Sequence, residues 1–345
     1  MNISTLFTQS YFTKEDILNL LKIEDPNDQK KLFQTADNIR RKNFGNGVFL
    51  RGIIEFSNFC RNNCSYCGLN ASNQKLPRYR LTKKQILDSV DLIYRANIKT
   101  IVLQSGEDNE LNFHWLGMII SEIKSKYPDT AITLSVGEWG LKEYEYWRKC
   151  GADRYLLKME TMNPKLYEEL HPNITFDHRM NCLKLLKELG YQVGSGNIVG
   201  LKVQTLDDIA NDLLHFCDAQ YDMLSISPFI PHHNTPLSKN SQVDPDIVLK
   251  IIAISRILSP KSHMPATTAL GSMGKDYRRD GLRAGANVIM PNFTPMPYKQ
   301  YYEIYNNKRC ITEKQGECAF CMKKMVESVG RHIEDGRGDS ILNEI

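Results

Sequence analysis

Three cysteines at residues 60–67 have the spacing of a ligand set for an iron–sulfur cluster. In the segment FCRNNCSYCGLN, Cys60, Cys64 and Cys67 form a Cys-x3-Cys-x2-Cys pattern. Thiolates this close together can bind three irons of a 4Fe-4S cubane, and the fourth iron then lacks a protein ligand. An open iron can bind the amino and carboxylate groups of a small molecule. The alternative, a structural zinc site, would need four closed ligands, and no further Cys or His follows at the usual spacing.

A second cysteine group lies near the C-terminus, where Cys310, Cys318 and Cys321 form a Cys-x7-Cys-x2-Cys pattern. Disulfides are rare in a reducing compartment, so clustered cysteines there indicate metal or redox chemistry. The remaining three cysteines stand alone within helical patterns and are expected to be small buried hydrophobic residues. These are Cys150, Cys182 and Cys217.

Composition and charge exclude several classes of protein. The chain has 345 residues, 41% of them hydrophobic, which is enough for a sizeable core. Its 44 basic and 40 acidic residues are spread along the chain, so we expect no nucleic-acid or membrane partner. No apolar stretch approaches the length of a membrane span, and residues 1–18 lack the basic-then-apolar order of a signal peptide. These features predict a cytoplasmic protein.

Secondary-structure elements must position the cysteines and the other polar residues. In this chain, short apolar runs alternate regularly with helical segments. Its short apolar runs are 48–58, 100–106, 131–137, 154–160, 191–200, 223–230, 264–270 and 287–292. Strands that alternate with helices indicate βαβ units, and eight of them predict a closed (β/α)8 barrel of the TIM type. We expect a helical cap over residues 1–46, the barrel over 47–295, and an appendage over 296–345 with the second cysteine group.

Polar residues gather where the apolar runs end. In a barrel of this kind the chemistry lies at the C-terminal ends of the strands. The residues at these ends are Asn58, Gln104, Glu107, Ser135, Glu138, Lys158, Glu160, Ser195, Asn197, Ser227, Thr267, Thr268 and Asn292. A purely structural barrel would have no reason to place carboxylates and amides at so many strand ends, so the pattern predicts an active site there.

An aromatic residue, Tyr66, precedes the last cysteine of the first group. With this residue the motif resembles the signature of the radical S-adenosylmethionine (SAM) superfamily. The resemblance implies that SAM chelates the fourth iron of a 4Fe-4S cluster. One electron then cleaves SAM to methionine and a 5′-deoxyadenosyl radical, in a barrel that excludes water and oxygen. An electron donor such as flavodoxin or ferredoxin is also implied.

Longer segments, from about residue 45 to about residue 330, resemble one family within this superfamily, the FeFe-hydrogenase maturase HydE. They are IIEFSNFCRNNCSYCGLN, RYRLT, TIVLQSGED, LSVGEW, GADRYLL, ETMNP, LKELGYQVGSG, SPFIPHHNTPL, PATTALG and AGANVIMPN. The resemblance implies a small-molecule substrate, an iron-carbonyl-cyanide complex that carries cysteine, on the route to the two-iron subcluster of the hydrogenase. It also implies other hydrogenase maturases as partners.

The resemblance to HydE implies roles for individual residues. Glu160 resembles the carboxylate that binds the SAM amino group, and Arg179 resembles the partner of the SAM carboxylate. The other residues implied for the SAM site are Tyr66, Gln104, Ser135, Ile198, Val199, Met290 and Tyr302. Those implied on the substrate side are Thr133, Lys158, Thr267 and Thr268. Hydroxyl donors suit a small anionic ligand, although threonines also fill strands for purely structural reasons.

One segment departs from the family pattern. HydE proteins commonly have Arg-His-Glu-Thr at the end of the fourth strand, where this chain has Lys158-Met159-Glu160-Thr161. Glu160 is retained, but lysine lacks the planar fork of arginine and methionine does not titrate. Two alternatives therefore stay open. One is a methylornithine synthase-like mutase or another HydE-related enzyme with an organic substrate, and the other is a non-catalytic iron–sulfur carrier or scaffold.

The second cysteine group resembles the accessory cluster site of some HydE proteins, which holds a 2Fe-2S or 4Fe-4S cluster. A surface zinc or iron site, or free thiols, are the alternatives. His232 and His233 have no third metal ligand nearby in the sequence, so we expect them to serve a loop. The tail RHIEDGRGD, residues 331–339, is expected to be solvent-exposed surface.

Overall fold

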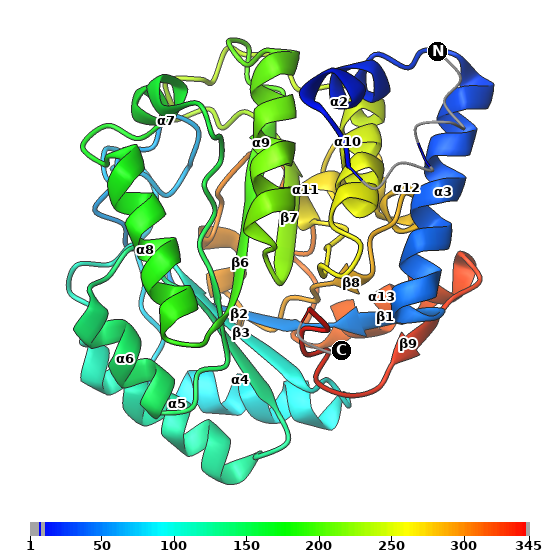
Figure 1. Ribbon diagram of the computed structural model, residues 1–345. Helices are drawn as coiled ribbons and strands as arrows, with labels where there is room; N and C mark the ends of the chain where they lie inside the picture. The colour runs from blue at the N-terminus through cyan, green and yellow to red at the C-terminus, as the bar shows by residue number, and fades with distance from the viewer. Residues whose placement is uncertain (1–6, 8–10, 343–345) are drawn as a thin grey trace.

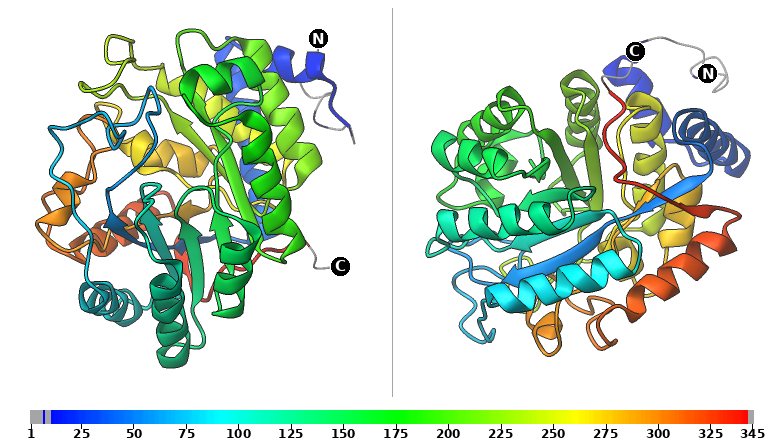
Figure 2. Two further views of the ribbon diagram at one scale, coloured as in Figure 1. Left: turned by 90° about the vertical axis from the view of Figure 1, so that its left-hand side faces the viewer. Right: turned by 90° about the horizontal axis from the view of Figure 1, so that it is seen from below.

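A computed structural model of the chain describes residue 7 and residues 11–342. Parallel strands form a barrel, and helices surround it on the outside (Figures 1 and 2). The first part of the predicted N-terminal cap, and half of the segment tested for a signal peptide, lie outside the described residues. The division of the chain at residues 46 and 295 stays a prediction.

Most of the barrel wall is one parallel sheet in the order β2-β3-β4-β5-β6-β7. Its strands are β2 (Gly52–Ser57), β3 (Thr100–Ser105), β4 (Ala131–Ser135), β5 (Arg154–Leu156), β6 (Gln192–Val199) and β7 (Met223–Pro228). A second sheet has the order β8-β1-β9 and contains β1 (Gly47–Leu50), β8 (Val288–Ile289) and β9 (His332–Glu334).

Isolated bridges close the circle between the two sheets. Met223 pairs with His263, Pro265 pairs with Val288, and Ile53 pairs with Asn292, all in parallel. These bridges place the 263–265 segment between β7 and β8, which confirms the predicted (β/α)8 barrel. The expected seventh strand at 264–270 is shorter than predicted. Thr267 accepts a hydrogen bond from the Leu270 amide (3.2 Å) and starts the helix α11 (Thr268–Gly271) there.

Helices follow the strands as the periodicity predicts. They are α4 (Lys83–Arg95), α5 (Phe113–Lys126), α6 (Leu141–Lys149), α7 (Pro164–Leu170), α8 (Phe176–Glu188), α9 (Leu206–Ala219), α10 (Pro245–Leu258) and α12 (Arg278–Arg283). In α4, Thr82 forms a capping box with Gln85, and Ile86, Val90 and Ile93 are buried on one face. Each helix thus covers the barrel with its apolar side.

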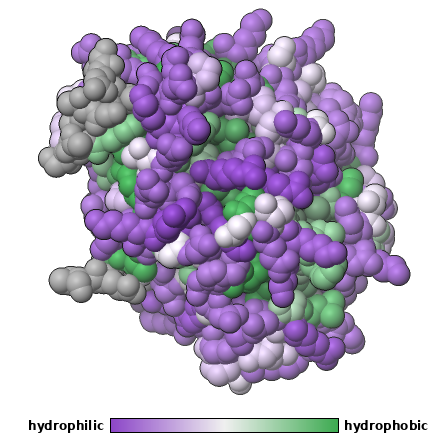
Figure 3. Space-filling view, turned by 90° about the vertical axis from the view of Figure 1, so that its right-hand side faces the viewer, coloured by the Kyte–Doolittle hydropathy of each residue, from purple (hydrophilic) through white to green (hydrophobic). Residues whose placement is uncertain are grey.

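Two N-terminal helices extend this layer, α2 (Lys14–Leu21) and α3 (Pro26–Phe44). The apolar face of α2 is buried at Ile17, Leu20 and Leu21. The helix α2 packs on α9 and α10, and α3 packs on α10 (Figure 1). The face that carries α3 is largely hydrophilic, and hydrophobic residues show there only in small patches (Figure 3). Among the described residues, no helix combines the length and the apolarity that crossing a bilayer would require.

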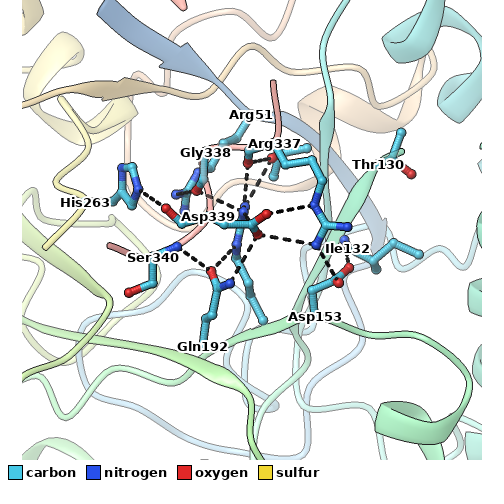
Figure 4. Close-up of polar contacts among 12 residues, drawn as sticks. Arg51, Thr130, Ile132, Asp153, Gln192, His263, Arg337, Gly338, Asp339 and Ser340 are labelled. Carbon is cyan, nitrogen blue, oxygen red and sulfur yellow. Dashed lines mark hydrogen bonds and ion pairs between the residues drawn. The ribbon is translucent and has the colours of Figure 1, made fainter. Parts of the chain in front are cut away.

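The C-terminal tail closes the floor of the barrel, so the expectation of a solvent-exposed tail holds for His332, Asp335, Gly336 and Asp339 but not for the buried Arg331 and Gly338. The strand β9 pairs with β1, and the following residues 337–339, here called the strap, cross the floor (Figure 4). Arg154, fully buried at the start of β5, donates to the carbonyls of Arg337 (2.7 Å) and Gly338 (2.9 Å). It also donates to the Asp339 carboxylate (2.8 Å). A buried guanidinium needs such partners, and the strap supplies them.

We expect Asp339→Ala to lower the free energy of unfolding by about 2 kcal/mol. Removing one partner of a buried ion pair costs about 3–5 kcal/mol, but the Asp339 side chain is 43% exposed, so water can partly replace it. Denaturant unfolding of the apoprotein measures the change. The control is Asp335→Ala, because the carboxylate of the exposed Asp335 accepts only a surface hydrogen bond from Asn97 (3.0 Å). Equal effects of the two changes would contradict the role of the strap.

Candidate active site

A cavity of about 340 Å³ opens at the C-terminal ends of the barrel strands. It collects most of the residues that the sequence predicts for the site. Those that line it are Cys60, Tyr66, Cys67, Gln104, Ser135, Lys158, Glu160, Arg179, Ile198, Thr267, Thr268, Met290 and Tyr302. A surface hollow of about 1050 Å³ beside α3 contains none of them. The residues that the strand-end rule singles out thus lie together around one cavity.

The three cysteines of the first group lie on the loop between β2 and α4. Cys60 and Cys67 line the cavity, and Cys64 lies within electrostatic reach of both. The loop is tied to the barrel by hydrogen bonds from the Ser65 amide to the Leu170 carbonyl and from the Gly68 amide to the Ile304 carbonyl, both 2.9 Å. Burial raises the pKa of Cys67 to about 12 and raises the pKa of Cys60 and of Cys64. These thiols therefore lose protons when they bind a metal.

The arrangement of the cysteines suits a cubane better than a single metal ion. Within residues 11–342, no three His, Cys, Asp or Glu side chains converge on a point that could hold one metal ion. A zinc ion would require such convergence. In a cubane each thiolate binds a different iron, so the three sulfurs do not meet at one point. The donor set thus fits a 4Fe-4S cluster with one iron open to the cavity.

Glu160 presents a buried carboxylate to the cavity from just beyond β5. Its amide donates to the Gly196 carbonyl, and its own carbonyl accepts from the Ile198 amide, both at 3.0 Å. Its φ is +66°, a strained value that persists where the surrounding structure holds it and that is common at functional sites. The Oε2 atom lies 2.8 Å from Lys158 Nζ but receives no properly directed hydrogen bond from the described residues. A buried carboxylate oxygen that has an ion-pair partner but no directed hydrogen bond can still accept one from a ligand ammonium group.

Arg179, from α8, lies across the same cavity. Its Nε donates to Glu138 and its Nη1 donates to the Lys158 carbonyl (2.6 Å). Burial is the largest single influence and opposes the charge of this guanidinium, but Glu138 and the nearby Tyr167 and Tyr66 together outweigh it, so the pKa of Arg179 is raised. Because Nε and Nη1 are bound within the protein, Nη2 is the nitrogen that can bind a ligand carboxylate. Glu160 and Arg179 together can therefore hold the two ends of an amino acid moiety.

Two residues that the sequence analysis missed, Glu55 and Lys308, also line the cavity. Glu55 and Lys308 form a buried ion pair, and Lys308 also donates to the Tyr302 carbonyl (2.8 Å). Asn292 donates to the second Glu55 oxygen (2.9 Å), and Gln104 donates to the Tyr302 hydroxyl (3.2 Å). Glu55 could have been identified from the sequence, because it is a carboxylate inside the apolar run IIEFS. Nothing in the sequence around Lys308 signals its place in the cavity.

The predicted threonines occupy different places. Thr268 and Thr267 line the cavity, but the Thr267 hydroxyl is used as the cap of α11. Thr133 lies on β4 outside the cavity lining and is 2% exposed. Its hydroxyl has no hydrogen-bond partner among the described residues. Among the threonines, Thr268 thus has the best position to meet a ligand.

The second cysteine group lies outside the cavity. Cys318 is buried on α13 (Glu317–Ser328), Cys310 lies beside it, and Cys321 is exposed on the same helix. The hydrogen bond from Cys318 lowers the pKa of Cys310 to about 7. Arg278 lies within electrostatic reach of both thiols.

The isolated residues that invited a functional reading behave mostly as expected. His232 is buried in a loop and stacks on His233, as a loop role predicts. Of the three isolated cysteines, Cys182 is buried as predicted. Cys150 and Cys217 are only partly buried, because each lies near the C-terminal end of a surface helix.

Comparisons with known proteins agree with this geometry. The model of the radical SAM superfamily matches residues 54–216. The chain is 48% identical to the [FeFe] hydrogenase maturase subunit HydE of Thermotoga maritima over 320 residues, which cover 93% of this chain and 91% of that protein. It is 30% identical to the 3-methylornithine synthase of Methanosarcina acetivorans over 281 residues, or 80% of this chain and 78% of that protein.

Solved structures share the fold. The crystal structure of methylornithine synthase (PylB) matches with a TM-score of 0.86 and 26% identity, over 96% of this chain and 97% of that chain. HydG, a maturase of the [FeFe]-hydrogenase, matches with a TM-score of 0.79 and 21% identity, over 94% of this chain and 74% of that chain. At this identity the second match shows the fold alone.

Proposed function

Because this chain belongs to the [FeFe]-hydrogenase maturase HydE family of radical SAM enzymes, we propose that it cleaves SAM reductively in the cavity described above. The reaction would serve the maturation of the hydrogenase cluster. One observation carries the proposal: a single cavity brings Cys60 and Cys67 together with the buried carboxylate of Glu160 and with Arg179. When bound, the 4Fe-4S cluster supplies the electron that cleaves SAM to a 5′-deoxyadenosyl radical.

The residues of the chain hold the reactants in place. Cys60, Cys64 and Cys67 would bind the cluster, Glu160 would accept hydrogen bonds from the SAM ammonium group, and Arg179 would bind the SAM carboxylate through Nη2. The backbone at 196–199 and the side chain of Tyr66 would flank the nucleoside, with Gln104, Ser135, Met290 and Tyr302 around it. The buried walls exclude water, which protects a radical from side reactions.

The other side of the cavity is suited to a small anionic substrate. Thr268 brings a hydroxyl group to it, and Lys158 and Lys308, each ion-paired with a carboxylate, bring ammonium donors. We propose that these residues bind the iron-carbonyl-cyanide complex that the family resemblance implies. Other hydrogenase maturases, and a donor such as flavodoxin or ferredoxin, would be the partners of a cytoplasmic enzyme.

Anaerobic reconstitution tests the proposal. The protein should bind four irons at the first site, and the reduced protein should convert SAM to 5′-deoxyadenosine. Adding the iron complex should raise the rate of cleavage, whereas L-cysteine alone should not. A reconstituted protein that leaves SAM intact would refute the proposal and would favour an iron–sulfur carrier or scaffold.

A methylornithine synthase-like mutase is the second candidate. The fold match to PylB and the replacement of Arg-His by Lys158-Met159 favour it. Incubation of the reduced protein with SAM and L-lysine separates the two candidates, because only a mutase would form methylornithine.

We further propose an accessory cluster, of 2Fe-2S or 4Fe-4S type, at Cys310, Cys318 and Cys321. Cys310 and Cys318 already lie together beside the positive charge of Arg278, which would stabilise thiolates. We expect Cys318→Ala to lower the iron content but to leave SAM cleavage within about twofold of the parent, because the site lies outside the cavity. Iron analysis and chromatographic assay of 5′-deoxyadenosine measure the two effects. Loss of SAM cleavage would mean that the second site takes part in the reaction.

A further inference from the structure

The loop that carries the first three cysteines is fastened at its base by one arginine. We call residues 58–73 the cysteine loop. Arg78 Nη1 donates to the carbonyls of Asn58 (2.6 Å) and Leu69 (2.8 Å), and Nη2 donates to those of Asn70 (2.6 Å) and Asn73 (3.3 Å). Asn58 precedes the cysteines and the other three residues follow them. A single guanidinium therefore joins the two ends of the loop.

Other contacts hold a different part of the loop. The Ala71 amide donates to the Asn62 carbonyl (2.8 Å), and the Ser72 amide donates to the Asn63 side chain (3.0 Å). These bonds link the tip of the loop, around the second cysteine, to its far end. They do not reach Asn58. The Asn58 side chain donates to the Pro77 carbonyl (2.8 Å) and accepts from the Tyr79 amide (2.7 Å), whereas the bonds of Arg78 join Asn58 to residues 69–73 across the base.

The charge of Arg78 is not cancelled by a carboxylate. Its hydrogen-bond partners are all carbonyl oxygens, and no Asp or Glu among the described residues forms an ion pair with it. The guanidinium is half-buried and lies within electrostatic reach of Cys60 and Cys67. A fixed positive charge beside bound thiolates stabilises the more negative, reduced form of a cluster.

We propose that Arg78 is a positioning residue for the cluster, which holds the base of the cysteine loop closed and whose charge favours the reduced state. The claim that the charge favours the reduced state rests on the proposed function, because it requires a cluster at the site. The claim that Arg78 holds the loop closed concerns the chain alone. Lysine cannot replace arginine in the first role, since it cannot reach four carbonyls from one planar group.

Two variants distinguish the effect of the Arg78 hydrogen bonds, which hold the loop closed, from the effect of its positive charge. Arg78→Lys keeps the positive charge and loses the fork, and Arg78→Gln loses both. In the apoprotein, hydrogen exchange of residues 58–73 should become about tenfold faster or more in both variants, because hydrogen bonds from a charged donor contribute about 1.5–3 kcal/mol each. In the reconstituted protein, redox titration monitored by EPR should give a more negative midpoint potential for Arg78→Gln and a nearly unchanged one for Arg78→Lys.

Lys75→Gln is the matched control. It removes one positive charge from the neighbouring exposed segment, where solvent and salt screen it, and should change neither measurement. Unchanged exchange in Arg78→Lys and Arg78→Gln, or an Arg78→Gln potential equal to that of Lys75→Gln, would overturn the proposal. Failure of the parent protein to cleave SAM would count against the proposed function instead, and the exchange measurement on the apoprotein would still test the fastening.

Discussion

Replacing Cys64 by alanine is expected to abolish the cluster of the first site and all SAM cleavage. Cys64 is one of three thiols that can bind the irons, and two thiolates leave two irons without protein ligands. SAM cleavage should fall by at least about three orders of magnitude, as when an essential catalytic group is removed. Iron and sulfide analysis, the visible absorbance of the cluster and the yield of 5′-deoxyadenosine measure the effect.

The folded state should survive this change, because the side chain is shortened by one atom on a loop that other hydrogen bonds tie to the barrel. Cys217→Ala is the control, since Cys217 is a free thiol on α9 away from the cavity. It should retain both the cluster and the activity. If the Cys64 variant still cleaved SAM, the assignment of the three ligands would be wrong.

Replacing Glu160 by glutamine is expected to weaken SAM binding by about 30-fold to 3,000-fold. Truncating one partner of a buried, hydrogen-bonded charge pair costs about 2–5 kcal/mol, and each 1.4 kcal/mol is a factor of ten. Glutamine keeps the size of the side chain, so only the negative charge and one acceptor are lost. Titration of the cluster EPR signal with SAM gives the dissociation constant.

The cluster itself should be unaffected in this variant, because Glu160 binds no iron in the proposed site. Equal iron content in parent and variant therefore separates a lost SAM contact from a lost cluster. Glu188→Gln, an exposed change on α8, should bind SAM as the parent does. Unchanged SAM affinity in the Glu160 variant would show that another group binds the ammonium.

The Glu160 site also shows where sequence reasoning stops. The residue could be found from its place after an apolar run and from its resemblance to the family. Its backbone conformation could not, because it depends on the pairing of this segment with Gly196 and Ile198 of β6. Those contacts join residues about 40 positions apart.

The sequence by itself determined the barrel, and it predicted the ligand set and the edge of the barrel at which the proposed site lies. The spacing of Cys60, Cys64 and Cys67 is local, and the alternation of apolar runs with helical segments is a repeating pattern. Parallel strands place their C-terminal ends on one face, so Gln104, Ser135 and Glu160 had to meet. Each of these inferences needs only short-range periodicity and one topological rule.

Only the tertiary structure decided that the last 50 residues belong to both ends of the barrel. Lys308 reaches Glu55 in the cavity, and the strap covers Arg154 at the floor. Arg78 likewise could not be told from any surface arginine, because its partners are backbone carbonyls. Every residue carries a carbonyl group, so a contact with a backbone carbonyl cannot be recognised in the sequence. Charged residues that are far apart in the sequence form ion pairs only when the chain has folded.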